Sequence, residues 1–487
     1  DAFVPRRWVE RLVAPFARGP EVASVTPMSD NAEVLTTPVE CSPAAVDPAA
    51  AEAIDRAASG LSPSAADVET PTGIGFCMAL SRRWLDRVPA FDAAFGRGYG
   101  EEVDWCRKTA ALGARHVATG RLFVPHRGGG SFGPDKVARI ARNNAIVARR
   151  YPGYDALVAA FRTTDPLVGP RLALGLAGAG AGFEALPVYL AHRIGGGAEL
   201  WLNREVAARA GQGNSAVILR DGEGAGEVLI ELHVPHGVTR ASVRLDEVGA
   251  YLALLRARRF VYSCLVGARD PLDMIDHVLA ILTTRDQVEL LMHDYFPVCP
   301  SYNLIGADGA FCNLPDPAAC QVCYGRLSNL SGARPPTIER WRAGWRPMLD
   351  RADRIVAFSD DSCVRLRGIW PEFAAKIVVD AHDPLHVPGR IEADPAARAI
   401  GVLGGIGYPK GAGVLQRLAR HDPTLGLTVI GKLDPAFADP AIRVHGAYDA
   451  GEIADLARRY GIRKWFIPSI WPETYSFTVR ECLATGL

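Results

Sequence analysis

The stretch Ala399-Ile-Gly-Val-Leu-Gly-Gly-Ile-Gly-Tyr-Pro-Lys-Gly-Ala-Gly-Val-Leu-Gln-Arg-Leu-Ala-Arg420 decides the fold class of the C-terminal part of the chain. Its apolar start predicts a strand over 398–404, and its last part predicts a helix over 411–420. The Gly-rich turn between them places backbone N–H groups at the start of a helix, where anions bind. Lys410 adds a positive charge to this turn. The pattern therefore indicates a phosphate or diphosphate site.

Two familiar nucleotide loops do not fit this turn. A Walker loop needs Ser or Thr after its Lys, but Gly411 and Ala412 follow Lys410. A dinucleotide fingerprint needs G-x-G-x-x-G and an acidic residue after the next strand. Here the spacing is G-G-x-G-x-x-x-G, and the next strand, L-T-V-I-G-K, ends in Lys432. A nucleotide-dependent oxidoreductase is therefore disfavoured, and a diphosphate site of another kind stays open.

Strands alternate with helices from residue 199 onward, which favours parallel sheets in doubly wound α/β domains. The turn-rich D-P-L-H-V-P-G-R near 383–390 suggests a boundary, so we expect one domain over 199–391 and another over 392–487. Residues 166–198, rich in Gly, Ala and Leu, are expected to form a helical linker. The candidate strands are 215–220, 227–233, 259–264, 288–292, 354–358, 376–380, 398–404, 426–430, 442–445 and 465–469.

Two glutamates stand eight positions apart in P-S-I-W-P-E-T-Y-S-F-T-V-R-E. Glu481 is predicted on a helix, and Glu473 on the loop before it. Carboxylates spaced in this way can accept hydrogen bonds from different hydroxyls of one ligand. The alternative is two solvated glutamates, but the flanking residues are too apolar for a freely exposed face.

Residues 199–487 resemble family 4 glycosyltransferases, which are retaining enzymes of the GT-B fold. The resemblance implies that Glu481 holds the nucleotide ribose and Glu473 contacts the donor sugar. It also implies that Lys410 neutralises the diphosphate. The family usually has Arg five residues before this Lys, where this chain has Gly405. Gly405 and Gly407 would then let the phosphates rest on the backbone.

Two further segments share this resemblance. R-I-V-A-F-S-D-D-S at 354–362 is similar to the segment that ends the family's N-terminal domain. L-M-H-D-Y-F-P-V-C-P at 291–300 is similar to the His-Asp turn on the acceptor side of the cleft, which implies that His293 faces the reacting centre. Without the family context, a capped turn is an equally good interpretation.

An acidic helix start lies in the first third of the chain, in G-R-G-Y-G-E-E-V-D-W-C at 96–106. Glu101, Glu102 and Asp104 fall in its first turn, where the helix dipole favours ionised carboxylates. Such a carboxylate can take a proton from a hydroxyl, and simple complementation of the dipole is the alternative. His126 follows in V-P-H-R-G-G-G-S, a pattern that favours metal or phosphate binding over a purely structural His.

These segments and T-G-I-G-F-C-M-A-L-S-R-R at 72–83 resemble the second half of family 2 glycosyltransferases, which are inverting enzymes of the GT-A fold. The resemblance covers about 1–165. It implies that Glu102 is the base, with Glu101 and Asp104 beside it. It also implies that His126 and Asp1, which matches the last Asp of the family's metal motif, bind a divalent cation. Oxygen ligands suit Mg²⁺ or Mn²⁺, and a His ligand favours Mn²⁺. Because the nucleotide-binding strands would precede Asp1, we expect the chain to be part of a longer polypeptide and this domain to be partial.

Four cysteines gather in a loop rich in Asn, Pro, Gly and Asp, over residues 299–323. They end in a C-x2-C pair and could bind a structural Zn²⁺ ion. A disulfide pair and four free thiols are the alternatives. The four residues are Cys299, Cys312, Cys320 and Cys323.

Composition limits the classes of function. Of 487 residues, 54 are Lys or Arg and 54 are Asp or Glu, so the basic excess typical of a nucleic-acid binder is missing. The scattered cysteines favour a reducing, cytoplasmic location. The basic stretch 139–150 allows peripheral contact with the inner face of a membrane, although a solvated helix face is the simpler interpretation.

The sequence thus predicts an α/β chain in which a partial GT-A-like domain precedes a GT-B-like pair of Rossmann-type domains. The expected function is sugar transfer from a nucleotide-sugar donor to a glycan or lipid-linked glycan, in bacterial polysaccharide synthesis. The alternative is a binding or scaffold protein with degenerate transferase folds, which the missing Arg favours.

Overall fold

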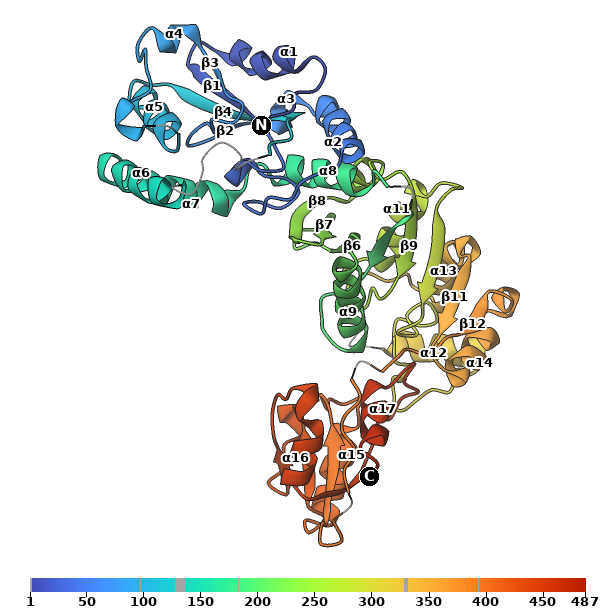
Figure 1. Cartoon of the computed structure of the whole chain (residues 1–487). Coiled ribbons are helices and arrows are strands. Elements are labelled where there is room, and N and C mark those ends of the chain that lie inside the picture. The colour runs from blue at the N-terminus through green and yellow to red at the C-terminus, as the bar shows by residue number, and fades with distance from the viewer. Residues whose placement is uncertain are drawn as a thin grey trace. The chain divides into compact units, whose positions relative to one another are not determined.

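The computed structural model describes residues 2–96, 98–127, 136–182, 184–327, 332–384, 386–392 and 394–487, and it confirms the α/β class (Figure 1). The chain divides into two compact units. Unit 1 comprises Asp1–Val188 and Val206–Arg259, and unit 2 comprises Tyr189–Glu205 and Phe260–Leu487.

Unit 1 contains a sheet with the strand order β2-β4-β1-β3. Strand β1 (Val22–Met28) pairs in parallel with β4 (Arg115–Phe123), and every residue of β1 is buried. The short strands β2 (Asp67–Glu69) and β3 (Ala79–Leu80) are antiparallel to their neighbours. The surrounding helices are α1 (Trp8–Val13), α2 (Pro48–Gly60), α3 (Pro63–Ala66), α4 (Arg82–Leu85), α5 (Glu101–Ala110), α6 (Lys136–Arg150), α7 (Tyr154–Thr164) and α8 (Val168–Ala179).

The expected helical linker over 166–198 is only partly helical. Helix α8 occupies its first half, but Leu186–Leu190 form strand β5, in which every residue is buried. The physical reason is the sequence L-P-V-Y-L, a short apolar run of the kind that forms a buried strand.

The expected helix–strand alternation is wrong over 215–244. Strands β6 (Ala216–Asp221), β7 (Glu227–Val234) and β8 (Gly237–Arg244) form an antiparallel meander. Parallel pairing needs a crossover of about a dozen residues or more, but β8 starts at Gly237, directly after the turn that follows Val234. Residues 206–259 also belong to unit 1, so the expected domain 199–391 differs from the observed units.

A second sheet has the order β12-β11-β10-β9-β5-β6-β7-β8. Strands β10 (Gln287–Leu291), β11 (Arg354–Ala357) and β12 (Ile377–Val379) pair in parallel, next to β9 (Arg258–Tyr262). The helices of this region are α9 (Gly197–Gly211), α10 (Val248–Leu252), α11 (Pro271–Ile281), α12 (Pro317–Arg326), α13 (Ile338–Arg351) and α14 (Asp360–Ile369).

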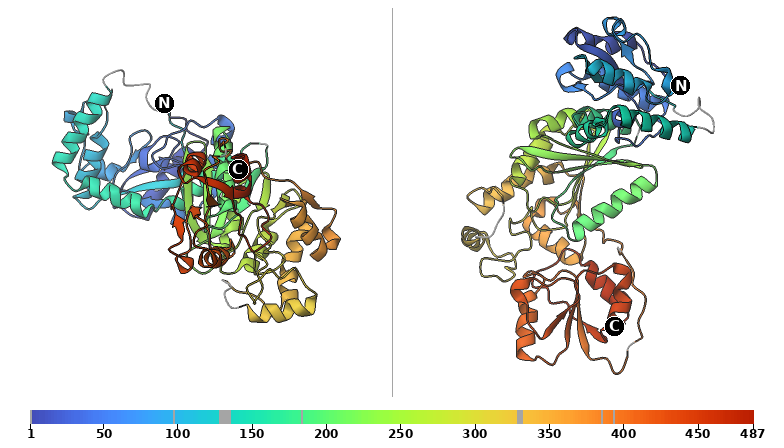
Figure 2. Two further views of the ribbon diagram at one scale, coloured as in Figure 1. Left: turned by 90° about the horizontal axis from the view of Figure 1, so that it is seen from below. Right: turned by 90° about the vertical axis from the view of Figure 1, so that its left-hand side faces the viewer.

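The last sheet is parallel and has the order β15-β14-β13-β16. Figure 2 shows helices on both of its faces, as in a doubly wound domain. Chain order reverses between β13 and β16, and ligands of such folds bind at this reversal, beyond the carboxyl ends of the strands. The elements are β13 (Ala399–Leu403), α15 (Ala412–His421), β14 (Leu427–Ile430), β15 (Ile442–Val444), α16 (Ile453–Arg459), β16 (Ile462–Trp465) and α17 (Phe477–Ala484).

Among the described residues, no helix combines the length and the apolar composition that a bilayer crossing requires.

Candidate functional site

The loops that follow β13 and β16 meet at the reversal of strand order in unit 2. Lys410 lies in the first loop and Glu473 in the second, and the Lys410 Nζ atom is 2.5 Å from Glu473 Oε2. The Ser469 hydroxyl donates a hydrogen bond to the other oxygen of the same carboxylate. The structure thus places two of the residues predicted for the donor site side by side.

A glycine permits this close approach. Gly411 has a φ of 83°, and a Cβ there would lie 2.0 Å from the carbonyl oxygen of Pro468. A larger residue would therefore separate the two loops. At Gly405 and Gly407, in contrast, a Cβ would meet no described atom within 4 Å. The backbone of the predicted phosphate turn therefore borders open space.

Glu481 lies on α17, as predicted, with 8% of its surface exposed. Burial raises the pKa of its carboxyl to about 7. Among the described residues, no hydrogen bond or ion pair joins Glu481 to Lys410 or Glu473. The two glutamates therefore face different surroundings, which suits contacts with different parts of one ligand.

His293 lies after the carboxyl end of β10, where it contacts a second histidine. Its Nε2 atom is 3.1 Å from Nε2 of His382, and its Nδ1 atom is 3.1 Å from the carbonyl oxygen of Ser263. Because a carbonyl only accepts, the hydrogen-bond network assigns the proton to Nδ1 of His293. His382 then donates from Nε2. Burial, followed by the neighbouring His382, lowers the pKa of His293 to about 3.

The sequence reasoning missed His382 and the aromatic rings around the pair. The His382 ring stacks on Phe358 at 3.7 Å and on Phe477 at 5.4 Å between ring centres, and Trp201 lies 5.1 Å from His293. His293, Phe358 and His382 follow β10, β11 and β12, whose carboxyl ends share one edge of the sheet. The sequence D-A-H-D at 380–383, a His flanked by two Asp after a predicted strand, was the available signal.

Hydrogen bonds join this edge to the loop that carries Glu473. The Thr474 hydroxyl donates to the carbonyl oxygen of His293 at 2.7 Å, and the Tyr475 hydroxyl donates to that of His382 at 2.7 Å. The histidine pair and the Lys410–Glu473 pair thus belong to one region of unit 2.

The acidic helix start of unit 1 forms as predicted, with Gly100 before the first residue of α5. Glu102 Oε2 accepts a hydrogen bond from the Gly100 N–H group at 3.1 Å. Burial, and secondly the charge of Glu101, raise the pKa of Glu102 to about 7. A carboxyl with such a pKa can accept a proton near neutral pH.

Asp104 has a structural role, which differs from the prediction that it belongs to the catalytic group. Its side chain is 1% exposed and forms ion pairs with Lys108 at 2.6 Å and Arg150 at 2.7 Å. The Tyr151 hydroxyl also donates to it at 2.8 Å. Burial raises its pKa, but these hydrogen bonds outweigh burial and lower the pKa overall. A carboxylate neutralised in this way links α5 to α6 and is a poor base.

His126 is oriented by the loop after β1. Its Nδ1 atom lies 2.8 Å from the carbonyl oxygen of Asn31, and its backbone N–H group donates to the side-chain carboxylate of Asp30 at 2.8 Å. Nδ1 therefore carries the proton, which leaves the Nε2 lone pair for a ligand such as a metal ion. Ala2 pairs with His126 in an isolated bridge. Asp1, its predicted partner in metal binding, lies outside the described residues.

Glu102 and His126 flank the same short segment of unit 1. A Cβ at Gly75 would lie 3.9 Å from Cδ of Glu102, and the next residue, Phe76, stacks on His126 at 5.1 Å. Glu33 was missed by the sequence reasoning. Its charge contributes to the raised pKa of Glu102, and its backbone is left-handed, with a φ of 46°.

The charges of the cysteines in the Cys-rich loop act on one another, Cys312 and Cys323 on Cys299, and Cys320 and Cys323 on Cys312. Cys299, Cys312, Cys320 and Cys323 are free thiols. Within the described ranges, which include all four, no group of three or more His, Cys, Asp or Glu is arranged to hold a metal ion. Structural Zn²⁺ stays a prediction, and metal analysis of the purified protein tests it.

No protein-family model matches the chain, and no curated protein matches it either. Among solved structures, it is similar to the pneumococcal O-GlcNAc transferase GtfA in complex with UDP and GlcNAc. The identity is 9% and the TM-score 0.33, over 56% of this chain and 51% of that chain. A GtfA/B complex matches with 11% identity and a TM-score of 0.31, over the same shares.

The catalytic domain of Starch Synthase IV from Arabidopsis thaliana, bound to ADP and acarbose, matches with 11% identity and a TM-score of 0.30. That match covers 60% of this chain and 79% of the other. The chain spans about half the length of the first two structures. Because all three scores are low, the function proposed below rests on this chain's own residues.

Proposed function

We propose that the chain is a glycosyltransferase that uses nucleotide-sugar donors, with a GT-B-like site in unit 2. The observation that carries this proposal is the meeting of Lys410 and Glu473 at the reversal of strand order between β13 and β16. A parallel α/β sheet binds its ligand at this place. An ammonium group there suits a diphosphate, and a carboxylate suits sugar hydroxyls.

Different residues of unit 2 have different roles in the transfer reaction. When donor binds, its diphosphate takes the place of Glu473 as partner of Lys410, which frees Glu473 for the sugar. The bond between the sugar and the diphosphate breaks, a bond to the acceptor oxygen forms, and the proton of the acceptor hydroxyl passes to the oxygen of the departing diphosphate. Lys410 stabilises the charge on the departing diphosphate, while His293 and His382 line the acceptor side. Glu481 holds the ribose.

Titration calorimetry with UDP, ADP and GDP tests this proposal. We expect at least one nucleotide to bind the wild-type chain and to bind Lys410→Ala about tenfold more weakly or worse, because one charge-assisted contact is lost. Lys464→Ala is the matched control, since it removes an exposed lysine from β16. Equal binding to Lys410→Ala and the wild type would contradict the assignment. Failure of all nucleotides to bind would favour the scaffold alternative.

For unit 1 we propose an inverting, GT-A-like acceptor side in which Glu102 is the base. The support is its raised pKa near 7 and its place beside the 75–76 segment. His126 offers Nε2 to a divalent cation, for which Mn²⁺ is the better match to a His ligand. Such a cation would stabilise the diphosphate leaving group. We further propose a glycan or lipid-linked glycan as the acceptor, within bacterial polysaccharide synthesis.

A further inference from the structure

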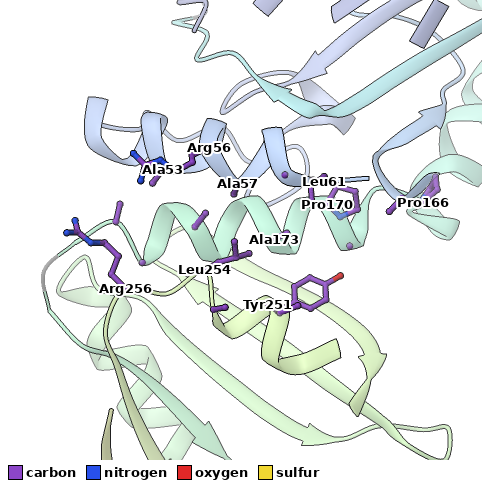
Figure 3. A pocket seen from close by; sticks show the side chains of 18 residues that line it. Ala53, Arg56, Ala57, Leu61, Pro166, Pro170, Ala173, Tyr251, Leu254 and Arg256 are labelled. Atoms are coloured by element: carbon purple, nitrogen blue, oxygen red, sulfur yellow. The ribbon is translucent and has the colours of Figure 1, made fainter. Parts of the chain in front are cut away.

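Two features of the molecule lie outside the sites described above. One is a cavity of about 770 Å³ in unit 1 between α2, α8 and α10 (Figure 3), whose lining residues do not specify an occupant. The other is the Cys-rich loop over 299–323 of unit 2. This loop contacts the turn that carries Lys410, so it bears on the candidate donor site.

A hydrogen bond joins the Cys-rich loop to the predicted phosphate turn. The Tyr408 hydroxyl donates to the carbonyl oxygen of Gly309 at 2.8 Å, across 99 positions of sequence. Tyr408 lies two residues before Lys410 and directly after Gly407, in the middle of the turn. Gly309 lies within the Cys-rich loop, which has no part in the transfer reaction proposed above. The contact therefore connects the turn to a segment outside the donor site.

Glycine at position 309 permits this contact. Its φ of 79° is left-handed, and a Cβ there would lie 2.5 Å from the hydroxyl oxygen of Tyr408. Glycine adopts such a backbone at no steric cost, and the missing side chain leaves room for the hydroxyl. A larger residue would push the Tyr408 ring away from the Cys-rich loop.

The segment that presents Gly309 is a short hairpin over residues 305–311, whose two ends pair in an antiparallel bridge. The Gly306 N–H group donates to the carbonyl oxygen of Ala310 at 2.8 Å, and the Gly309 N–H group donates to that of Gly306 at 3.0 Å. These bonds fix the direction of the Gly309 carbonyl, which is the acceptor for Tyr408.

Two helices of unit 2 hold the 305–311 hairpin in place. The Ala307 N–H group donates to Sγ of Cys323, on α12, at 3.4 Å. The Arg365 guanidinium, on α14, lies over the Phe311 ring at 4.7 Å from its centre. The hairpin is therefore supported independently of Tyr408, and it can serve as a fixed anchor for the turn.

The phosphate turn needs such an anchor because of its composition. Four of the eight residues at 404–411 are glycines, and glycine loses more conformational freedom than other residues when it becomes ordered. Contacts that hold such a loop before the ligand arrives reduce this cost and strengthen binding. Tyr408 supplies a contact of this kind from the centre of the turn.

We propose that Tyr408 is a positioning residue, which holds the phosphate turn in its binding conformation by anchoring it to the 305–311 hairpin. Because the Tyr408 hydroxyl is bonded to Gly309, it acts through the backbone of the turn and does not contact the phosphates. The Cys-rich loop thus contributes to donor binding from outside the site. This inference rests on the donor site proposed for unit 2.

Ligand-observed NMR titration of the whole chain with UDP, ADP and GDP, and with their nucleosides, tests this inference. We expect Tyr408→Phe to bind the nucleoside diphosphate about threefold to tenfold more weakly, the effect of one lost hydrogen bond. Binding of the nucleoside should not change, because the turn holds only the phosphates. Tyr460→Phe is the matched control, since it removes a hydroxyl that is bonded to His445 at 2.9 Å and lies outside the turn.

A second variant disturbs the same contact from the hairpin. Gly309→Ala should also weaken binding of the nucleoside diphosphate, because its Cβ meets the Tyr408 hydroxyl. In a chain that carries Tyr408→Phe, the nearest remaining atom of this ring lies 3.5 Å from that Cβ, so adding Gly309→Ala should have little further effect. Such a non-additive result shows that the two residues act through one contact. Circular dichroism confirms that all variants fold.

The outcomes separate this inference from the proposed function. Wild-type affinity of Tyr408→Phe, together with weaker binding to Lys410→Ala, would overturn the inference and leave the donor site standing. Equal losses for the nucleoside diphosphate and its nucleoside would show a general structural effect, and additive effects of Tyr408→Phe and Gly309→Ala would show that the contact is not used; either result overturns the inference. If the wild type binds none of the three nucleotides, the donor site and the inference both fail.

Discussion

At the scale of single residues, the protonation of Glu102 links stability to pH. Burial raises its pKa from 4.5 to about 7. The folded chain therefore holds a proton that the unfolded chain releases between these two values, so this group makes stability fall as pH rises through this window. The penalty is complete above pH 7 and absent below about 4.5.

Replacing Glu102 by Gln removes this penalty. We expect the Tm of Glu102→Gln to exceed that of the wild type at pH 8 and to approach it at pH 4.5, as measured by differential scanning calorimetry. The exposed Glu10→Gln is the control. A Tm difference that does not change with pH would show that Glu102 has the same pKa in the folded and the unfolded state.

A second prediction at this scale concerns the effect of His382 on the pKa of His293. Burial and secondly His382 lower the pKa of His293 to about 3. His382→Gln removes a neighbouring imidazole, so the pKa of His293 should move upward, toward 6.5. Proton NMR titration of the His293 ring measures this shift. His277→Gln, at a half-exposed position of α11, should leave the titration of His293 unchanged. An unmoved His293 after His382→Gln would contradict the contact at 3.1 Å.

At the scale of elements, two glycines of one turn have opposite roles. Gly411→Ala puts a Cβ 2.0 Å from the Pro468 carbonyl oxygen at a φ of 83°, so it should lower the free energy of unfolding by more than about 1 kcal/mol. Gly405→Ala meets open space and should leave stability nearly unchanged. Denaturant unfolding checks both expectations.

The same two variants separate folding from binding. If phosphates rest on the backbone of this turn, Gly405→Ala should weaken nucleotide binding while the chain stays stable. A stable Gly405→Ala with wild-type affinity would show that the phosphates do not approach this backbone position.

At the scale of the whole molecule, the two units should respond differently to a nucleotide. In EDTA, which removes the cation proposed for unit 1, a bound nucleoside diphosphate should slow hydrogen exchange in unit 2 at 402–411 and 468–481. At 100 times Kd, one site stabilises the folded state by about 2.7 kcal/mol. Exchange mass spectrometry measures the protection, with Lys410→Ala as the control. Protection confined to unit 1 would refute the site in unit 2.

Local patterns in the sequence were enough to predict several parts of this protein. The apolar run, Gly-rich turn and helix at 398–420 fold as expected, because each depends on neighbours within a few residues. The same holds for Glu473 on a loop, Glu481 on a helix and Glu102 in the first turn of α5. The α/β class follows from the same local signals.

Only the tertiary structure decided which residues meet. His293 and His382 are 89 positions apart and come together because parallel strands end at one edge of a sheet. The sequence pattern placed Asp104 in a catalytic group, but in the folded chain its carboxylate is neutralised by Arg150, which lies 46 positions away. The prediction missed the antiparallel meander β6–β8 because the alternation of apolar residues in a strand does not determine whether the neighbouring strand runs parallel or antiparallel. Sequence patterns report local conformation, whereas the burial and charge that set each side chain's role come from partners far along the chain.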